Sequence, residues 1–147
     1  MDSSYRTILL ALDLSDDSEI IGRKGIELAR RFDARLSLLH VVEYVPVEPM
    51  GEAILPAVQV EDELVDSAQR RLGELARKLE IDDASCRVEV GNIKLEVVRV
   101  AREQHVDLIV LGSRERHGLA ILVNLTEDAV LHAAPCDVLA VRLHGNR

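Results

Sequence analysis

Aromatic residues are scarce in this sequence. Tyr5, Phe32 and Tyr44 are the only ones among 147 residues, and tryptophan is absent. Proteins that hold single-stranded nucleic acid usually stack its bases on aromatic rings. The formal net charge is −8, whereas nucleic acids and anionic membrane surfaces attract basic patches. Both observations predict that neither nucleic acid nor a membrane is a partner of this protein.

Cysteine is scarce as well. Cys86 and Cys136 are the only two, and they lie too far apart to indicate a disulfide framework or a metal cluster. No metal-ligand spacing is found among the histidines, which are His40, His105, His117, His132 and His144. The first residues, MDSSYRTILLAL, show no leader pattern, and no apolar run is long enough to cross a bilayer. We therefore expect no metal site and a cytoplasmic location.

The apolar and charged shares, 48% and 30%, are those of an ordinary globular protein. The length fits one domain, and no internal repeat or linker divides it, so we expect a single domain over residues 1–147.

Short apolar runs alternate with segments of helical period along the chain. The runs predict strands at Thr7–Leu12, Arg35–Val42, Ser85–Val90, Asp107–Gly112 and Asp137–Leu143. The helical patterns lie at residues 15–32, from about Val60 to Leu79, from Ile93 to about Gln104, and at Thr126–Ala133. Proline and glycine between Glu43 and Gln59 predict a long connection there. This alternation predicts an α/β fold, an open five-stranded parallel sheet with helices on both faces.

Ligands in such sheets bind at the carboxyl ends of the strands, near the point where the strand order reverses. Asp13, Val41 and Gly112 lie at three predicted strand ends. A ligand site is therefore expected among these residues.

Four segments in order resemble the universal stress protein family: ILLALDLSDDS, ARLSLLHVVE, VDLIVLGSR and AAPCDVLAVR. The similarity covers nearly the whole chain and omits only the connection around residues 44–60. It implies a Rossmann-like parallel α/β domain that pairs as a homodimer. The family has two branches: one binds ATP through the motif Gly-x-x-Gly, about nine residues, then Gly followed by Ser or Thr, and the other lacks this motif.

The resemblance assigns the motif positions one by one. Gly112 matches the first glycine, Arg114 lies in the first spacer, and Glu115 stands where the second glycine belongs. Asn124 replaces the last glycine and Leu125 replaces the hydroxyl residue, after a spacer of eight residues. The phosphate side of this nucleotide pocket is therefore expected to be degenerate.

The adenosine side is expected to survive, because Asp13 and Val41 match positions that contact adenosine in nucleotide-binding members. On the phosphate side, Leu125 removes a hydrogen bond worth ~1.5–3 kcal/mol. Glu115, at about 5 Å from a phosphate, costs about 1 to 3 kcal/mol, depending on the local dielectric. A combined loss of about 3–5 kcal/mol moves a micromolar site into the millimolar range. Arg114, Arg116 and His117 would offset part of this if they turn inward.

Structural roles compete with these assignments. An Asp at a strand end, such as Asp13, more often caps a turn or helix than binds a ligand. Gly112 is also typical of a simple turn after a strand. Residues 114–117 are also typical of a solvated charged run. His40, in an apolar strand, is expected to be a hydrogen-bonded core histidine, and Cys136 a buried thiol without an activating base.

The last predicted strand, DVLAVRL, would be an exposed apolar edge of the sheet. The family pairs this strand with its own copy, so we expect a homodimer through the region of Val138, Leu139 and Val141.

Three functions follow from the resemblance. The first is a non-enzymatic stress-response module without catalytic residues or cofactor, which acts through its dimer and a protein partner. The second is a nucleotide sensor that still binds ATP or AMP. The third is a slow ATPase or self-phosphorylating protein, for which the sequence shows no evident base or metal ligands.

Overall fold

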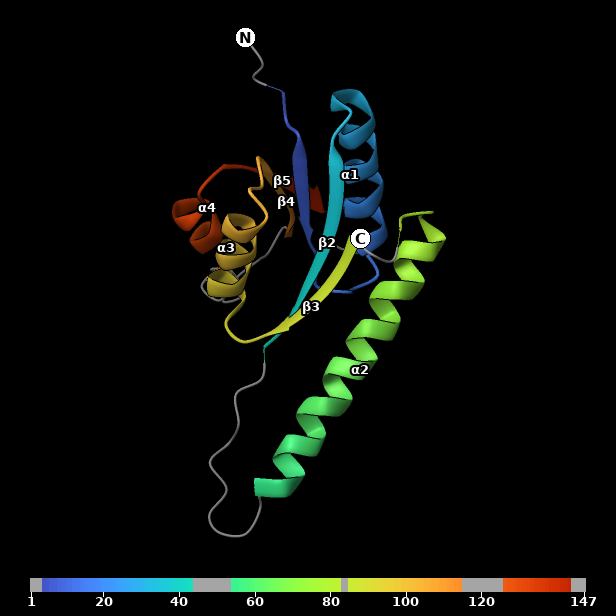
Figure 1. Cartoon of the computed structure of the whole chain (residues 1–147), viewed down its shortest axis with the longest axis vertical. Coiled ribbons are helices and arrows are strands. Elements are labelled where there is room, and N and C mark those ends of the chain that lie inside the picture. Colours follow the sequence, from blue (N-terminus) through green and yellow to red (C-terminus); the bar gives the residue numbers. More distant parts are fainter. Residues whose placement is uncertain (1–3, 44–53, 83–84, 115–125, 144–147) are drawn as a thin grey trace.

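The computed structural model describes residues 4–43, 54–82, 85–114 and 126–143 (Figure 1). Strands and helices alternate along the chain, as the sequence predicted. The strands are β1 (Thr7–Ala11), β2 (Arg35–Val42), β3 (Cys86–Val90), β4 (Leu108–Arg114) and β5 (Asp137–Leu143). The helices are α1 (Ser18–Phe32), α2 (Ile54–Lys78), α3 (Ile93–Glu103) and α4 (Thr126–Ala133).

The five strands form one parallel sheet in the order β3-β2-β1-β4-β5. The predicted open parallel sheet is therefore confirmed, with β3 and β5 at its two edges. The chain moves from β1 outward to β3, and then returns past β1 to form β4 and β5. The strand order consequently reverses between β1 and β4, the position at which parallel α/β sheets bind ligands.

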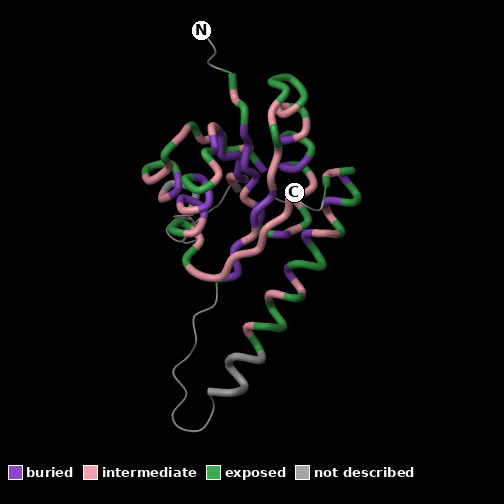
Figure 2. The backbone as a smooth tube through the Cα atoms, in the orientation of Figure 1, coloured by how far each residue is buried: buried purple, intermediate pink, exposed green. Residues whose placement is uncertain are grey.

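Each face of the sheet carries its own aliphatic core, because alternate residues of a strand point to opposite faces. On one face, Ile8 and Leu10 of β1 pack with Leu72 of α2. On the other, Leu9 packs with Val100 of α3. Buried residues accordingly concentrate between the sheet and the helices on its two sides (Figure 2).

Several element boundaries differ from the sequence prediction, most by one to three residues, and two differences change the interpretation of a proline or a glycine. Helix α2 begins at Ile54, within the segment predicted to be a connection. Pro56 lies in its first turn, where an amide N–H has no acceptor inside the helix, so proline is tolerated there. Strand β4 continues past Gly112 to Arg114, which pairs with Leu143 of β5. Residues 44–53 of the predicted connection lie outside the described residues.

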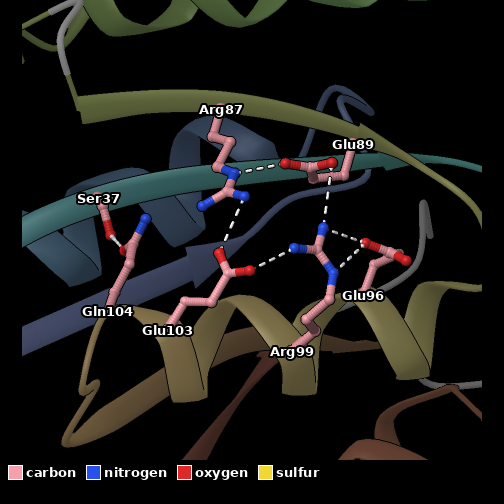
Figure 3. A network of polar contacts seen from close by, with 7 residues as sticks. All are labelled: Ser37, Arg87, Glu89, Glu96, Arg99, Glu103 and Gln104. Carbon is pink, nitrogen blue, oxygen red and sulfur yellow. Dashed lines mark hydrogen bonds and ion pairs between the residues drawn. The ribbon is translucent and has the colours of Figure 1, made fainter.

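A network of ion pairs joins the edge strand β3 to α3 (Figure 3). Arg87 of β3 contacts Glu89 at 2.5 Å and Glu103 of α3 at 3.0 Å. Arg99 of α3 contacts Glu89 at 3.1 Å, Glu96 at 2.5 Å and Glu103 at 2.6 Å. These side chains are partly solvated, so each pair adds little free energy alone. Together, however, they fix the charged face of β3 against α3.

Helix α3 is also fixed at both ends. The side chain of Asn92 caps its first turn by accepting a hydrogen bond of 3.0 Å from the Leu95 N–H. Beyond its last turn, Gln104 Oε1 accepts a hydrogen bond of 3.0 Å from Ser37 Oγ of β2 (Figure 3). The helix is thereby held over β2 and β3.

Candidate functional site

Three of the predicted site residues lie at one end of the sheet. Ala11 pairs with Leu39, so Asp13, two residues after β1, lies level with Val41, near the end of β2. Leu10 pairs with Val110, which brings Gly112 to the level of the residue after Ala11. The structure therefore places Asp13, Val41 and Gly112 at one level near the carboxyl ends of three adjacent strands, around the reversal between β1 and β4.

Asp13 shapes the turn from β1 into α1. Its Oδ1 accepts hydrogen bonds from the Ser15 N–H at 2.9 Å and from Ser18 Oγ at 3.3 Å. Ser18 is the first residue of α1 and is 2% exposed. Leu14, between them, has a left-handed backbone with a φ of 60°. Asp13 thus performs the turn-capping role that the sequence left as its alternative, while its side chain remains exposed.

Two further side chains fix this turn from the neighbouring elements. His40 Nδ1 of β2 lies 2.7 Å from the carbonyl oxygen of Leu12. Because a carbonyl oxygen only accepts, the proton of this hydrogen bond resides on Nδ1. From α2, the guanidinium of Arg71 donates to the carbonyl oxygen of Leu14. The predicted hydrogen bond of His40 is confirmed, although its side chain is half-buried and not part of the core.

Val41 and Gly112 belong to the packed interior around the site. The Val41 side chain is 7% exposed and packs in the core on the α3 side of the sheet. Gly112 lies inside β4, opposite Val141 of β5, and its φ is not positive. The prediction that Gly112 ends its strand was wrong, because the ladder with β5 continues for two more residues.

The phosphate side of the predicted pocket is only partly described. Arg114 is the last residue of β4. Glu115, Asn124 and Leu125 lie outside the described residues. Their assigned roles remain predictions from the sequence.

A comparison with known proteins identifies the family. The sequence profile described as "Universal stress protein family" matches residues 4–142. The chain belongs to this family. A relative named universal stress protein A homolog 2, from Coxiella burnetii, is 40% identical over 144 residues, which cover 97% of this chain and 99% of the relative.

Solved structures of universal stress proteins share this fold. Universal stress protein UspA from Lactobacillus plantarum superposes with a TM-score of 0.71 at 23% identity, covering 96% of this chain and 100% of its own. A universal stress protein solved in complex with cAMP gives a TM-score of 0.59 at 24% identity, covering 95% and 98%. At this level of identity, both comparisons establish the fold alone.

The described part of this universal stress protein also bears on metal binding, membrane insertion and thiol reactivity. Among the residues described, no cluster of three or more His, Cys, Asp or Glu side chains could hold a metal ion. No described helix is long and apolar enough to cross a membrane. Burial, followed by the charges of Asp137 and Asp107, raises the pKa of the Cys136 thiol to about 11. A thiol with such a pKa is protonated at neutral pH and is a poor nucleophile, as the sequence analysis expected.

Sequence reasoning missed the residues that hold the site in shape. Ser18 was part of a predicted helix start, but its bond to Asp13 depends on the path of the turn. Arg71 reaches the site from a helix that is distant in sequence, so no local pattern reveals it. A short-range signal exists only for Ser15, which follows Asp13 by two residues, as in an Asx turn.

Proposed function

We propose that this protein is a cytoplasmic, homodimeric stress-response module that is not an enzyme and binds ATP weakly or not at all. It acts through its surface on a protein partner. The observation that carries this proposal is the set of replacements in the glycine motif: Glu115, Asn124 and Leu125 stand where the motif has glycine, glycine and a hydroxyl residue. A carboxylate near the phosphates and the loss of a hydroxyl donor both weaken anion binding.

The geometry of Asp13 supports the same proposal. One of its carboxylate oxygens already accepts from Ser15 and Ser18, so it serves the turn itself. A ligand group that competes for this oxygen has to displace a hydrogen bond of a nearly buried hydroxyl. The site thus has a structural use that does not require a nucleotide.

Titration calorimetry with ATP, AMP and Mg²⁺ tests this proposal. We expect no binding, or millimolar binding, by the unmodified protein. The triple variant Glu115→Gly, Asn124→Gly, Leu125→Ser should gain affinity, because it restores the motif. Micromolar binding of ATP by the unmodified protein would overturn the proposal.

A nucleotide sensor is the second candidate. One structural neighbour was solved with cAMP, and the structure brings Asp13, Val41 and Gly112 to one end of the sheet. Under this alternative, AMP or cAMP binds in the same calorimetric experiment, while ATP is disfavoured by Glu115. An Asp13→Ala variant should then abolish binding of the nucleoside part.

The proposed homodimer forms through β5. This strand is an edge of the sheet, and Leu139 is 36% exposed on it. Val141→Pro should yield a monomer in sedimentation, as should Leu139→Glu, which leaves the backbone ladder intact. Leu131→Glu, at a position 56% exposed on α4, is the control that should remain dimeric. A dimer that survives the two β5 substitutions contradicts this interface.

A further inference from the structure

The opposite edge of the sheet offers backbone groups for pairing. Within the described chain, β3 pairs only with β2. The Gly91 N–H donates to the Val42 carbonyl oxygen at 3.0 Å, so the backbone groups of Gly91 point toward β2. In a parallel ladder the facing residues alternate. The N–H and C=O groups of Cys86, Val88 and Val90 therefore point away from the sheet.

A groove runs between this edge and α2. Its volume is about 860 Å³, and Cys86 and Val88 contribute apolar side chains to it from β3. A Cβ atom built on Gly73 of α2 meets nothing within 4 Å, so the groove is open at its middle. The other residues that line it are Asp66, Gln69, Arg70, Leu72 and Arg77. An open strand edge beside a helix is the geometry in which an extended peptide adds a strand.

The groove carries positive charge that the fold does not use. Arg70 and Arg77 are exposed. Among the described residues, neither arginine forms an ion pair. Asp66 is the one acidic residue that lines the groove. On the other face of β3, the charges of Arg87 and Glu89 are occupied by the network with α3 (Figure 3). The groove side of this edge thus combines apolar side chains with two arginines that form no ion pair with other described residues.

We propose that the groove between β3 and α2 binds an extended segment of another protein, which adds a strand to β3 and carries glutamate at alternate positions. The proposal rests on the proposed function, in which the protein acts through a protein partner, and it assigns the surface for that partner. A glutamate on the groove side lays its methylene groups on Val88 and its carboxylate beside an arginine. Arg70 and Arg77 are seven residues apart, about 10.5 Å along the helix. Alternate residues of a strand recur about every 6.6 Å, so two or three glutamates span them.

Physical arguments disfavour a second copy of this chain as the occupant. The proposed dimer already uses β5, at the opposite edge. Self-pairing at both edges would extend the sheet from molecule to molecule without closure and produce fibres. The charged face of β3, fixed by Arg87 and Glu89, is also a feature that protects edges against indiscriminate pairing.

The probe for the test is a fluorescent eight-residue peptide of alternating Glu and Val, and its control has Lys in place of Glu. We expect binding of the Glu peptide in fluorescence anisotropy and none of the Lys peptide. In amide exchange followed by NMR, the N–H groups of Val88 and Val90 should become protected by the peptide. Those of Arg87 and Glu89, which face β2, should change little. This alternation distinguishes strand addition from non-specific attraction.

Charge-reversal variants test the role of the two arginines. Arg70→Glu with Arg77→Glu should weaken binding of the Glu peptide by about tenfold or more. The matched control, Arg30→Glu with Arg102→Glu, changes two exposed arginines of α1 and α3 by the same charge and should leave affinity unchanged. Val88→Pro removes an outward N–H and should abolish binding while far-ultraviolet circular dichroism stays native.

Three outcomes overturn the proposal: no binding of the Glu peptide, equal weakening in both charge-reversal pairs, or exchange protection without the alternation. Self-association that Val88→Pro abolishes would overturn it as well, because the occupant would then be a second copy. Each of these outcomes leaves the calorimetry with ATP unaffected. Failure of this inference is thereby distinguishable from failure of the proposed function.

Discussion

Gly112 of β4 lies so close to Ile21 of α1 that a Cβ atom on the glycine would be 2.7 Å from the isoleucine Cδ1. The same Cβ atom would be 2.7 Å from Cδ1 of Leu143 on β5. Ile21 and Leu143 are 2% and 3% exposed, so their terminal methyl groups would have to rearrange within the core. Gly112 is therefore required for packing between helix and sheet, independently of any ligand.

This relationship predicts that Gly112→Ala destabilises the protein by about 1–3 kcal/mol, the usual effect of overpacking a core. Gly73→Ala is the matched control, because its Cβ atom would meet nothing within 4 Å inside helix α2. There alanine should stabilise by about 0.5–1 kcal/mol through its higher helix propensity. Urea denaturation of both variants measures the difference. Equal effects of the two substitutions would contradict this account.

Asp107 joins the starts of two strands and permits a second prediction. A single oxygen, Oδ2, accepts from the Arg6 N–H at 2.9 Å and from the Thr7 N–H at 3.0 Å. Asp107→Ala leaves the N–H of the buried Thr7 without this acceptor, which should cost about 1–3 kcal/mol of unfolding free energy. Asp107→Asn keeps one carbonyl oxygen, so urea denaturation should show less than half of that loss. Comparable losses in both variants would show that the charge, not the hydrogen bonds, matters.

Much of this fold could be predicted from apolar periodicity alone. Each predicted apolar run between Thr7 and Leu143 is a strand in the structure. The alternation of these runs with helices correctly predicted that the strands are parallel. The errors arose where proline and glycine were interpreted as breakers. Pro56 is tolerated in the first turn of α2, because no amide donor is needed there. Gly112 lies inside β4 at a position that needs no side chain.

The candidate site was predictable only in part. The strand ends follow from local patterns, so Asp13, Val41 and Gly112 could be placed at one end of the sheet. The contact of Arg71 with Leu14 could not, because it depends on how α2 packs on the turn. For the same reason the groove beside β3 escaped prediction: Arg70 and Arg77 form an ordinary polar helix face until the fold brings them beside an open strand edge.

The raised pKa of Cys136 yields a third prediction. In a Cys86→Ser variant, Cys136 is the only thiol, and its pKa is raised from 9.0 to about 11, chiefly by burial. Its thiolate fraction at neutral pH is then about 100-fold below that of an ordinary cysteine. Alkylation by iodoacetamide should be correspondingly slow and should rise about tenfold per pH unit from pH 7 to 9.5 without levelling off. In urea, the same thiol should titrate near 9.0; a folded-state curve that levels off there would refute the prediction.

Glu103 provides the prediction on pH. Its hydrogen bond to Arg87, reinforced by Arg99, holds the pKa of this carboxyl below its ordinary value of 4.5. In the unfolded chain Glu103 takes up its proton near 4.5, whereas in the folded chain it does so only at lower pH. Between these two values the unfolded state binds more protons, so stability falls as the pH falls. Above pH 4.5 the full contribution of Glu103 is present.

Glu103→Gln should therefore flatten the acid side of the stability profile. We expect urea midpoints of the variant to lie below those of the unmodified protein at pH 7, and the two to converge as the pH falls below 4.5. Glu74→Gln is the control, because Glu74 is an exposed acid of α2 that forms no ion pair with other described residues. Its profile should run parallel to that of the unmodified protein. The difference in urea midpoint between Glu103→Gln and the unmodified protein could instead stay constant down to pH 3. The network with Arg87 and Arg99 would then add no pH-dependent stability, and β3 would be held against α3 by packing alone.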